Sequence, residues 1–183
     1  MILYLTRHGE TDYNAEGRYQ GRLDIPLNAK GIAQAKALAE SLAETPIDRI
    51  VSSPQLRARK TAEIVAARLA LPLELSSALV EINMGVFENL TREEARARYP
   101  EHWQRISEKA EYLPPPEGES HEEVLQRALG EIKRLQSLYA EQSVLVVCHG
   151  FVARTLHCHL LNIPYAEMQA AAFDNCEVRK YRL

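Results

Sequence analysis

Four basic side chains stand near the ends of short apolar runs that are widely separated in the chain: Arg7, His8, Arg57 and His149. Two imidazoles and two guanidiniums in one pocket would repel one another unless an anion lay between them. Guanidinium groups match phosphate oxygens in a bidentate geometry, and a neutral imidazole can attack phosphorus as a nucleophile. If these side chains meet in space, their types favour the binding and transfer of a phosphoryl group.

The apolar runs beside these residues have the length and composition of strands. Residues 2–5 and 48–51 are short and apolar, and 143–148, with the sequence SVLVVC, is typical of a central parallel strand covered on both faces. A weaker strand is predicted at 73–75, and residues 176–183 alternate in the manner of a final edge strand. These runs are the predicted strands of one sheet.

Segments with helical periodicity separate the strands. Helices are predicted at 31–43, 55–69, 120–138 and 150–161, with two shorter ones on either side of Pro100. Ser120 and Glu123 form the S-x-x-E pattern of a capping box, in which each side chain satisfies a backbone donor at the start of the helix. Strands that alternate with helices predict an α/β fold with a mostly parallel sheet. No linker or repeat divides residues 1–183, so we expect a single domain.

The sheet would bring the four basic side chains together. In an open parallel sheet the ligand crevice lies outside the carboxyl ends of the strands, and three of the predicted strands end at these residues. Each feature alone is ambiguous, because a lone histidine at a strand end more often packs or faces solvent, and Arg57 could lie on the solvated face of a helix. The coincidence of three strand ends favours one cleft. Helices that begin after Gly9 and Gly150 would add backbone N–H donors for an anion.

The bulk properties are those of an ordinary globular protein. The chain has 183 residues, 46% of them apolar and 26% charged, and its formal net charge is −3 with the basic residues scattered. This composition disfavours a nucleic-acid binder with a broad basic face, and three cysteines without C-x-x-C spacing do not indicate a disulfide framework. No apolar run approaches the roughly 18 residues of a membrane span, and the first residues lack a signal-peptide pattern. We therefore expect a cytoplasmic monomer or homodimer that binds neither nucleic acid nor membrane.

His157 and His159 raise the question of a metal site. Side chains at positions i and i+2 of a helix do not share a face, so the two cannot bind one ion together. Neither Ser52 nor Ser53 lies in a G-x-S-x-G elbow, and the chain has no G-x-x-x-x-G-K-[ST] loop. The sequence therefore favours an activity without metal or cofactor, and it disfavours a serine hydrolase and a P-loop nucleotide hydrolase.

Six segments carry a resemblance to a known family: LTRHGETDYN, GRYQGRLDIPLN, SSPQLRARKTA, EINMGVFEN, PEGES and VVCHG, in that order. Together they resemble the histidine phosphatase superfamily, in the branch that contains cofactor-dependent phosphoglycerate mutases, fructose-2,6-bisphosphatases and α-ribazole phosphatases. The resemblance runs from the first predicted strand to at least Gly150. It implies a three-layer α/β/α, phosphoglycerate mutase-like fold, with a small helical insertion at approximately residues 82–118 that caps the site.

The resemblance also implies a role for each motif residue. His8 matches the nucleophile that becomes a phosphohistidine, and the family pattern suggests that the backbone of Gly9 fixes its tautomer. Glu81 matches the acid that protonates the leaving oxygen and then helps to activate water. Arg7, Arg57 and His149 match the groups that hold the phosphoryl oxygens, and further phosphate or substrate contacts are implied for Asn14, Tyr19, Gln20, Gly21 and Gly150.

A phosphatase is favoured over a mutase. The mutases of this branch have a longer middle segment, a longer C-terminal tail and an asparagine at the position of Phe151. We expect hydrolysis of a small phosphorylated metabolite, with α-ribazole 5'-phosphate or a broad range of monoesters as candidate substrates. Phe87, Trp103 and Tyr112 would stack on the leaving group or pack the helical insertion. A non-catalytic interaction module on the same fold is a further alternative, disfavoured because the motif residues are all present.

Overall fold

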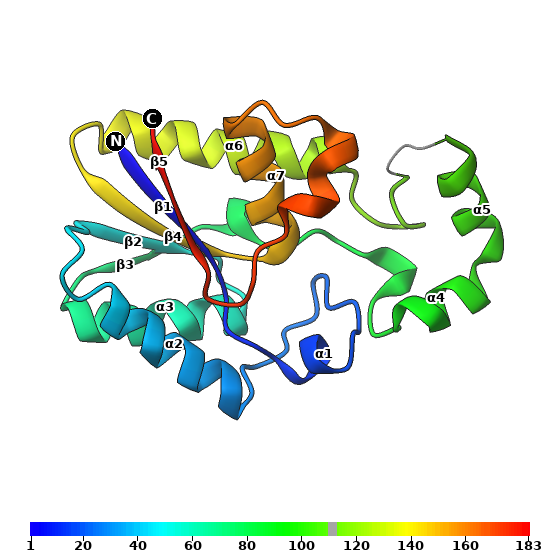
Figure 1. The fold of residues 1–183 in the computed structure, drawn as a ribbon, viewed down its shortest axis with the longest axis horizontal. Coiled ribbons are helices and arrows are strands. Elements are labelled where there is room, and N and C mark those ends of the chain that lie inside the picture. The colour runs from blue at the N-terminus through cyan, green and yellow to red at the C-terminus, as the bar shows by residue number, and fades with distance from the viewer. Residues whose placement is uncertain (110–112) are drawn as a thin grey trace.

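A five-stranded sheet forms the centre of the protein in the computed structural model, which describes residues 1–109 and 113–183 (Figure 1). Its strands are β1 (Ile2–Arg7), β2 (Arg49–Ser52), β3 (Leu73–Leu75), β4 (Ser143–Cys148) and β5 (Val178–Arg182), in the order β3-β2-β4-β1-β5. β5 runs antiparallel to β1, and the other neighbouring pairs are parallel. The mostly parallel sheet is confirmed, and the last segment is an edge strand as predicted.

Helices cover both faces of this sheet, which confirms the α/β/α layering (Figure 1). One face carries α2 (Ala29–Ser41) and α3 (Leu56–Leu69), and the other carries α6 (His121–Leu138) and α7 (Gly150–Leu160). α2 begins before the expected Gly31 because Asn28 caps it, its side-chain oxygen accepting the Gly31 backbone N–H. The capping box predicted at Ser120 and Glu123 is present at the start of α6.

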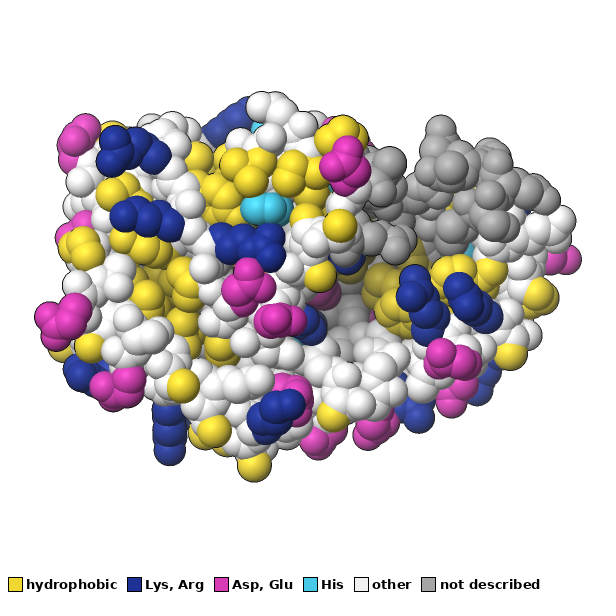
Figure 2. All heavy atoms as spheres, viewed as in Figure 1, with side chains coloured by type: hydrophobic (Ala, Val, Ile, Leu, Met, Phe, Trp, Pro, Cys, Tyr) yellow, Lys and Arg dark blue, Asp and Glu magenta, His cyan; other side chains and the backbone are white. Residues whose placement is uncertain are grey.

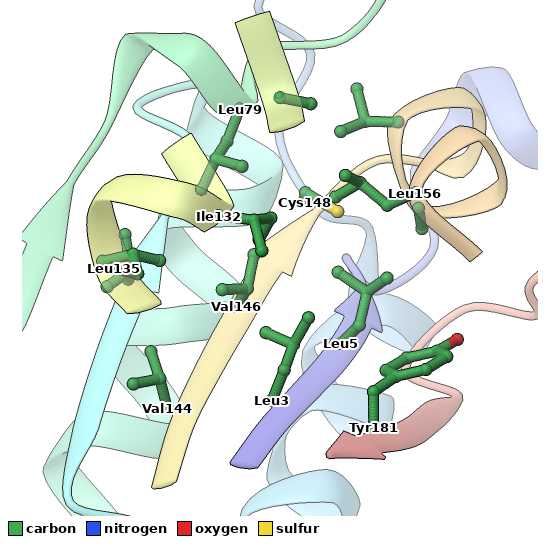
Figure 3. Packing of buried hydrophobic residues seen from close by; sticks show 14 of the residues in the cluster. Leu3, Leu5, Leu79, Ile132, Leu135, Val144, Val146, Cys148, Leu156 and Tyr181 are labelled. Carbon is green, nitrogen blue, oxygen red and sulfur yellow. The ribbon is translucent and has the colours of Figure 1, made fainter. Parts of the chain in front are cut away.

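The core forms on both faces of β4, in which every residue is buried. Successive side chains of a strand point to opposite faces. Leu145 and Val147 therefore pack against α2 and α3, whereas Val144 and Val146 pack against α6 and α7. Figure 3 shows the cluster on the α6 and α7 face, in which Ile132 of α6 lies next to Val146. This packing fixes where the carboxyl ends of β1 and β4 lie.

The segment at residues 82–118 lies beside these layers (Figure 1). It contains the 3₁₀ helix η2 (Gly85–Phe87) and the two predicted short helices, α4 (Arg92–Arg98) and α5 (Pro100–Lys109). Pro100 occupies the first position of α5, where its missing N–H would have no partner in the helix. Phe87, Leu90 and Ala95 form a small buried cluster separate from the main core.

The sequence patterns miss four short elements among the described residues: α1 (Asp12–Ala15), η1 (Ser77–Leu79), η2 and η3 (Tyr165–Ala171). Each is too short to show an apolar period. α1 depends on a capping box at Thr11 and Asn14. No helix in the described part of the chain is long and apolar enough to cross a membrane.

Candidate active site

The carboxyl ends of three neighbouring strands meet at one cavity. Arg7 at the end of β1 pairs with Cys148 at the end of β4, and β2 lies on the other side of β4. A cavity of about 640 Å³ opens at this edge of the sheet, and Arg7, His8, Arg57 and Gly150 line it. Figure 2 shows this face hollowed between the sheet layers and the 82–118 segment. The structure thus places three of the four predicted basic residues, Arg7, His8 and Arg57, on one cavity, whereas the fourth, His149, is fully buried and is not among the residues that line it.

His8 is held as a neutral imidazole in one tautomer. Its Nδ1 lies 2.6 Å from the carbonyl oxygen of Gly9. A carbonyl only accepts hydrogen bonds, so Nδ1 carries the proton and Nε2 keeps a free lone pair. Burial, together with the charges of Arg57 and Arg7, lowers the pKa of His8 well below its usual value of 6.5. The ring is therefore in the form that a nucleophile needs.

One peptide unit beside His8 is bound at both ends. Asn175 Nδ2 donates to the carbonyl oxygen of His8 at 2.8 Å, and the N–H of Gly9 donates to Thr61 Oγ1 at 3.1 Å. These two atoms belong to the same peptide group, which therefore cannot rotate without losing both bonds. A Cβ at Gly9 would lie 2.5 Å from the carbonyl oxygen of Gly31, so the close approach of the two backbones requires glycine. Together these contacts set where the Gly9 carbonyl meets the imidazole.

Two arginines are oriented by backbone carbonyls. The Arg57 guanidinium donates to Leu23 O at 2.7 Å and to Gly21 O at 2.9 Å, and Arg7 donates to Phe173 O at 2.9 Å. Burial lowers the pKa of both, that of Arg57 to about 10, and each remains charged at neutral pH. Neither guanidinium is neutralised by a carboxylate in an ion pair within the described residues. Their charge remains available to an anion in the cavity.

His149 is fully buried next to His8. The two ring centroids are 5.2 Å apart, and His149 Nε2 lies 2.8 Å from the hydroxyl oxygen of Ser53, which follows β2. Burial is the main cause that lowers the pKa of His149 well below its usual value, and Arg57 adds to the effect. The residue links the end of β4 to the end of β2.

Three buried nitrogen atoms around His8 have no hydrogen-bond partner within the described residues: Nε of Arg7, Nε of Arg57 and Nδ1 of His149. Buried polar atoms in folded proteins are nearly always paired, and each unpaired one costs free energy. Their grouping around one imidazole indicates a site that is completed by a ligand with several acceptor oxygens. A phosphoryl group has that chemistry.

Gly150 begins α7, so the predicted helix start beside the cavity is present there. A Cβ at Gly150 would lie 3.3 Å from Nε of Arg7, a tight contact that the glycine avoids. The corresponding expectation for Gly9 is wrong. α1 begins only at Asp12, because Thr11 rather than a residue beside Gly9 caps it.

Among the described residues that line the cavity, Glu81 is the one acidic side chain. Its Oε1 accepts from the N–H of Ile82, and its Oε2 accepts from the N–H of Phe151 at 3.2 Å. Its own N–H donates to Gln55 Oε1, whose amide nitrogen in turn donates to Gly21 O. The carboxyl group is therefore held at the edge of the anion site.

The other residues implied by the family pattern also line the cavity: Asn14, Tyr19, Gln20 and Gly21. Asn14 Oδ1 accepts the N–H of Thr11, and Gln20 is buried with its Oε1 accepting the Thr11 hydroxyl. Gly21 contributes mainly its carbonyl, which receives hydrogen bonds from Arg57 and Gln55. Its φ of +51° is a left-handed conformation that favours glycine.

Aromatic residues form the outer wall of the cavity. Phe87 is 2% exposed and stacks on Trp103, with ring centroids 6.1 Å apart and planes 11° apart. Both residues pack the 82–118 segment and line the cavity, so the two alternatives for them are not exclusive. Tyr112 lies outside the described residues.

Sequence reasoning missed several residues that hold or line this site: Gln55, Thr61, Arg154 and Asn175. Gln55 and Thr61 belong to the SSPQLRARKTA segment, and Thr61 follows Arg57 by one helical turn, so the position of Thr61 on the Arg57 face was a usable signal. Asn175 lies in a loop before the edge strand, where no pattern marks it.

A family model for the histidine phosphatase superfamily (branch 1) matches residues 3–183. The chain belongs to the histidine phosphatase superfamily. Phosphoserine phosphatase 1 of Hydrogenobacter thermophilus is 34% identical over 94% of this chain and 82% of its own length. A protein of Escherichia coli O1:K1 named "Probable phosphoglycerate mutase GpmB" is 36% identical over 98% of this chain and 84% of its own.

Solved structures of this superfamily agree with the fold. A mycobacterial glucosyl-3-phosphoglycerate phosphatase in complex with VO3 has a TM-score of 0.88 at 31% identity, covering 98% of this chain and 90% of its own. The α-ribazole phosphatase from Shigella flexneri has a TM-score of 0.88 at 29% identity, and the match covers 98% of this chain and 89% of that one. Relatives named as phosphatases support phosphatase activity for this member of the superfamily.

Proposed function

We propose that this histidine phosphatase hydrolyses small phosphomonoesters through a phosphohistidine on His8, without a metal or a cofactor. The observation that carries the proposal is the state of His8. Its Nδ1 is committed to the Gly9 carbonyl, which leaves Nε2 as the reactive atom. Arg7 and Arg57 are close enough to act on its charge, His149 lies against its ring, and each of these three residues has an unpaired buried nitrogen. A neutral nucleophile beside fixed cations is suited to attack on a phosphate dianion.

The first half-reaction transfers the phosphoryl group to the protein. The lone pair of His8 Nε2 attacks phosphorus, and the bond between phosphorus and the ester oxygen breaks. Protonated Glu81 gives its proton to that oxygen, so the leaving group departs as an alcohol. Arg7, Arg57 and His149 hold the phosphoryl oxygens, with Asn14 and the N–H of Gly150 as further contacts.

The second half-reaction releases phosphate. Water attacks the phosphorus atom of the phosphohistidine, and the carboxylate of Glu81 takes a proton from this water. The bond between phosphorus and Nε2 breaks, and its electron pair returns to His8. Inorganic phosphate leaves, and both His8 and Glu81 are restored to their starting forms.

The substrate is a small phosphorylated metabolite. Relatives carry names that include phosphoserine, glucosyl-3-phosphoglycerate and α-ribazole phosphatase. A cavity of about 640 Å³ is much larger than a phosphate ion, so it also accommodates a leaving group. We propose α-ribazole 5'-phosphate or a broad range of monoesters, bound with Tyr19, Gln20 and Gly21 on the substrate side and the 82–118 segment as the cap.

Phosphoglycerate mutase activity is the alternative that one comparison favours, because the GpmB relative carries that name. A mutase must return the phosphoryl group to a sugar acid before water intercepts it. Phe151, beside Glu81, places an apolar ring where mutases of this branch have an asparagine. A hydrolase releases phosphate without 2,3-bisphosphoglycerate, whereas a mutase isomerises 3-phosphoglycerate in its presence.

The proposal is tested by trapping the phosphoenzyme. Rapid quenching with a ³²P-labelled monoester should give label on the wild-type protein that is stable in base and lost in acid. His8→Ala should show no label and no phosphate release. His159→Ala, which removes an exposed histidine from α7, is the matched control and should label normally. Labelling that survives in His8→Ala would overturn the mechanism, and an unlabelled, inactive wild type would favour an interaction module.

A further inference from the structure

We propose that Arg154 forms a second anion-binding point in the cavity, which selects phosphate esters whose leaving group carries a further negative charge. This inference rests on the proposed function, because it assumes that the phosphoryl group sits at His8. It extends that function by naming a class of leaving group.

Arg154 differs from the other arginines in the outer part of the cavity. Arg18 is paired with Glu16 and Glu94, and the Arg92 guanidinium lies over the ring of Trp103. Arg154 makes no hydrogen bond or ion pair with any described residue, and its Nε is buried without a partner. A guanidinium with five donors and no acceptor is therefore left for a ligand.

The position of Arg154 relates it directly to the phosphoryl site. Gly150 lies against Arg7, and Arg154 follows Gly150 by four residues on the same face of α7. Four residues of an α-helix rise about 6 Å along its axis. A second anionic group within a few bonds of the ester oxygen would span this interval.

Electrostatics favours such a ligand. Arg154 is close enough to Arg7 for its charge to lower the pKa of Arg7, so the two cations repel each other in the unliganded protein. An ester with negative charge at both ends would relieve this repulsion. The guanidinium also lies 5.4 Å from the ring centroid of Phe151, and Met168 and Phe173 line the same cavity. In such partly apolar surroundings a charge-assisted hydrogen bond is stronger than in open water.

The chemistry required is an anionic group on the leaving group, either a carboxylate or a second phosphate. Three phosphate esters with the same three-carbon skeleton distinguish recognition of a carboxylate from recognition of a second phosphate. Glycerol 3-phosphate carries no second charge, 3-phosphoglycerate carries a carboxylate in place of the hydroxymethyl group, and glycerol 1,3-bisphosphate carries a second phosphate. We expect the wild-type protein to prefer at least one charged ester over glycerol 3-phosphate by roughly 10- to 100-fold in kcat/KM.

Arg154→Met keeps an unbranched stem that reaches about as far as Nε of arginine, and it removes the charge. This variant should bring the ratio of kcat/KM between charged and uncharged esters close to one, and Arg154→Lys should restore part of it. Arg68→Met, which removes the same charge from an exposed pair with Glu40, should leave the ratio at its wild-type value. An equal preference for all three esters in the wild type, or an unchanged ratio in Arg154→Met, would overturn the inference.

A binding measurement separates failure of this inference from failure of the proposed function. Calorimetric titration of His8→Ala with 3-phosphoglycerate and glycerol 3-phosphate reports the second anion site without turnover. Weaker discrimination in His8→Ala/Arg154→Met would support the site even if no phosphohistidine formed. If the wild-type protein forms the phosphohistidine while His8→Ala binds the two esters equally well, the mechanism is retained and the role of Arg154 is refuted.

Discussion

The two ends of the cavity are built differently. At the phosphoryl end, His8, Arg7 and Arg57 are each fixed by a backbone carbonyl of the protein. At the outer wall, side chains such as Phe87 and Trp103 are held by packing among themselves in a small cluster beside the sheet layers. Backbone carbonyls are present whatever the side chains are, whereas a packed cluster changes shape with each substitution. The difference predicts a constant phosphoryl chemistry and an adjustable leaving-group site.

Removal of a phosphoryl-end cation should give the largest effect among these variants. Arg57→Ala should lower kcat by roughly 10²- to 10³-fold, because it removes a preorganised charge from the transferring phosphoryl group. Arg96→Ala, which removes a cation lying over the Trp103 ring in the outer wall, should change kcat only a few-fold. Steady-state kinetics measures both, with circular dichroism to verify folding. An Arg57 effect confined to KM would show that this residue binds the substrate without assisting transfer.

The next largest effect on kcat is expected when the peptide group beside His8 loses a hydrogen bond. Thr61→Val leaves the Gly9 N–H without its acceptor, so the Gly9 carbonyl no longer holds the imidazole in one orientation. We expect kcat to fall roughly 10- to 100-fold with little change in KM. Thr61→Ser keeps the hydroxyl and should restore most of the rate. Equal losses in the two variants would assign Thr61 to packing alone.

Lowering the pH should destabilise the unliganded protein through the two buried histidines. The pKa values of His8 and His149 in the folded protein lie well below 6.5, whereas imidazoles of the unfolded chain titrate near that value. The unfolded chain then binds more protons, so this stabilisation is complete above about pH 6.5 and is lost as the pH falls, at up to about 1.4 kcal/mol per pH unit for each histidine.

Urea unfolding at a series of pH values measures this loss. His149→Asn should reduce the slope of the free energy of unfolding against pH. His102→Asn, at the outer wall, should reduce it less, because His102 is only half-buried although burial also lowers its pKa. A larger reduction of this slope in His102→Asn than in His149→Asn would contradict the expectation that the phosphoryl end contributes more to the pH dependence.

The smallest effect is expected at the outer wall. Trp103→Leu should alter KM by roughly 3- to 10-fold for bulky esters such as p-nitrophenyl phosphate, because it removes apolar contact area from the cavity. The inhibition constant of inorganic phosphate depends on the phosphoryl end of the cavity, and it should change less than the KM for bulky esters. A larger change in phosphate inhibition than in the KM values would show that the two ends are not separable.

The order of strands and helices could be predicted from the sequence because each long element carries its own signal. The buried run SVLVVC, the capping box at Ser120 and the helical stripes all depend on neighbours in the chain. The short elements α1, η1 and η3 have no such period, and the helix expected after Gly9 was wrong because the capping residue lies further along, at Thr11.

By itself the sequence determined the fold class, the family and the residues that could meet a phosphoryl group, because residue type and spacing at strand ends are local properties. Only the tertiary structure decided how they are held. The peptide after His8 is bound by Thr61 and Asn175, which are 52 and 167 residues away from their partners in the chain. Contacts over such separations leave no periodic trace, since they arise only when the sheet has brought distant segments together. For the same reason the unpaired charge of Arg154 became visible only when its neighbours were known.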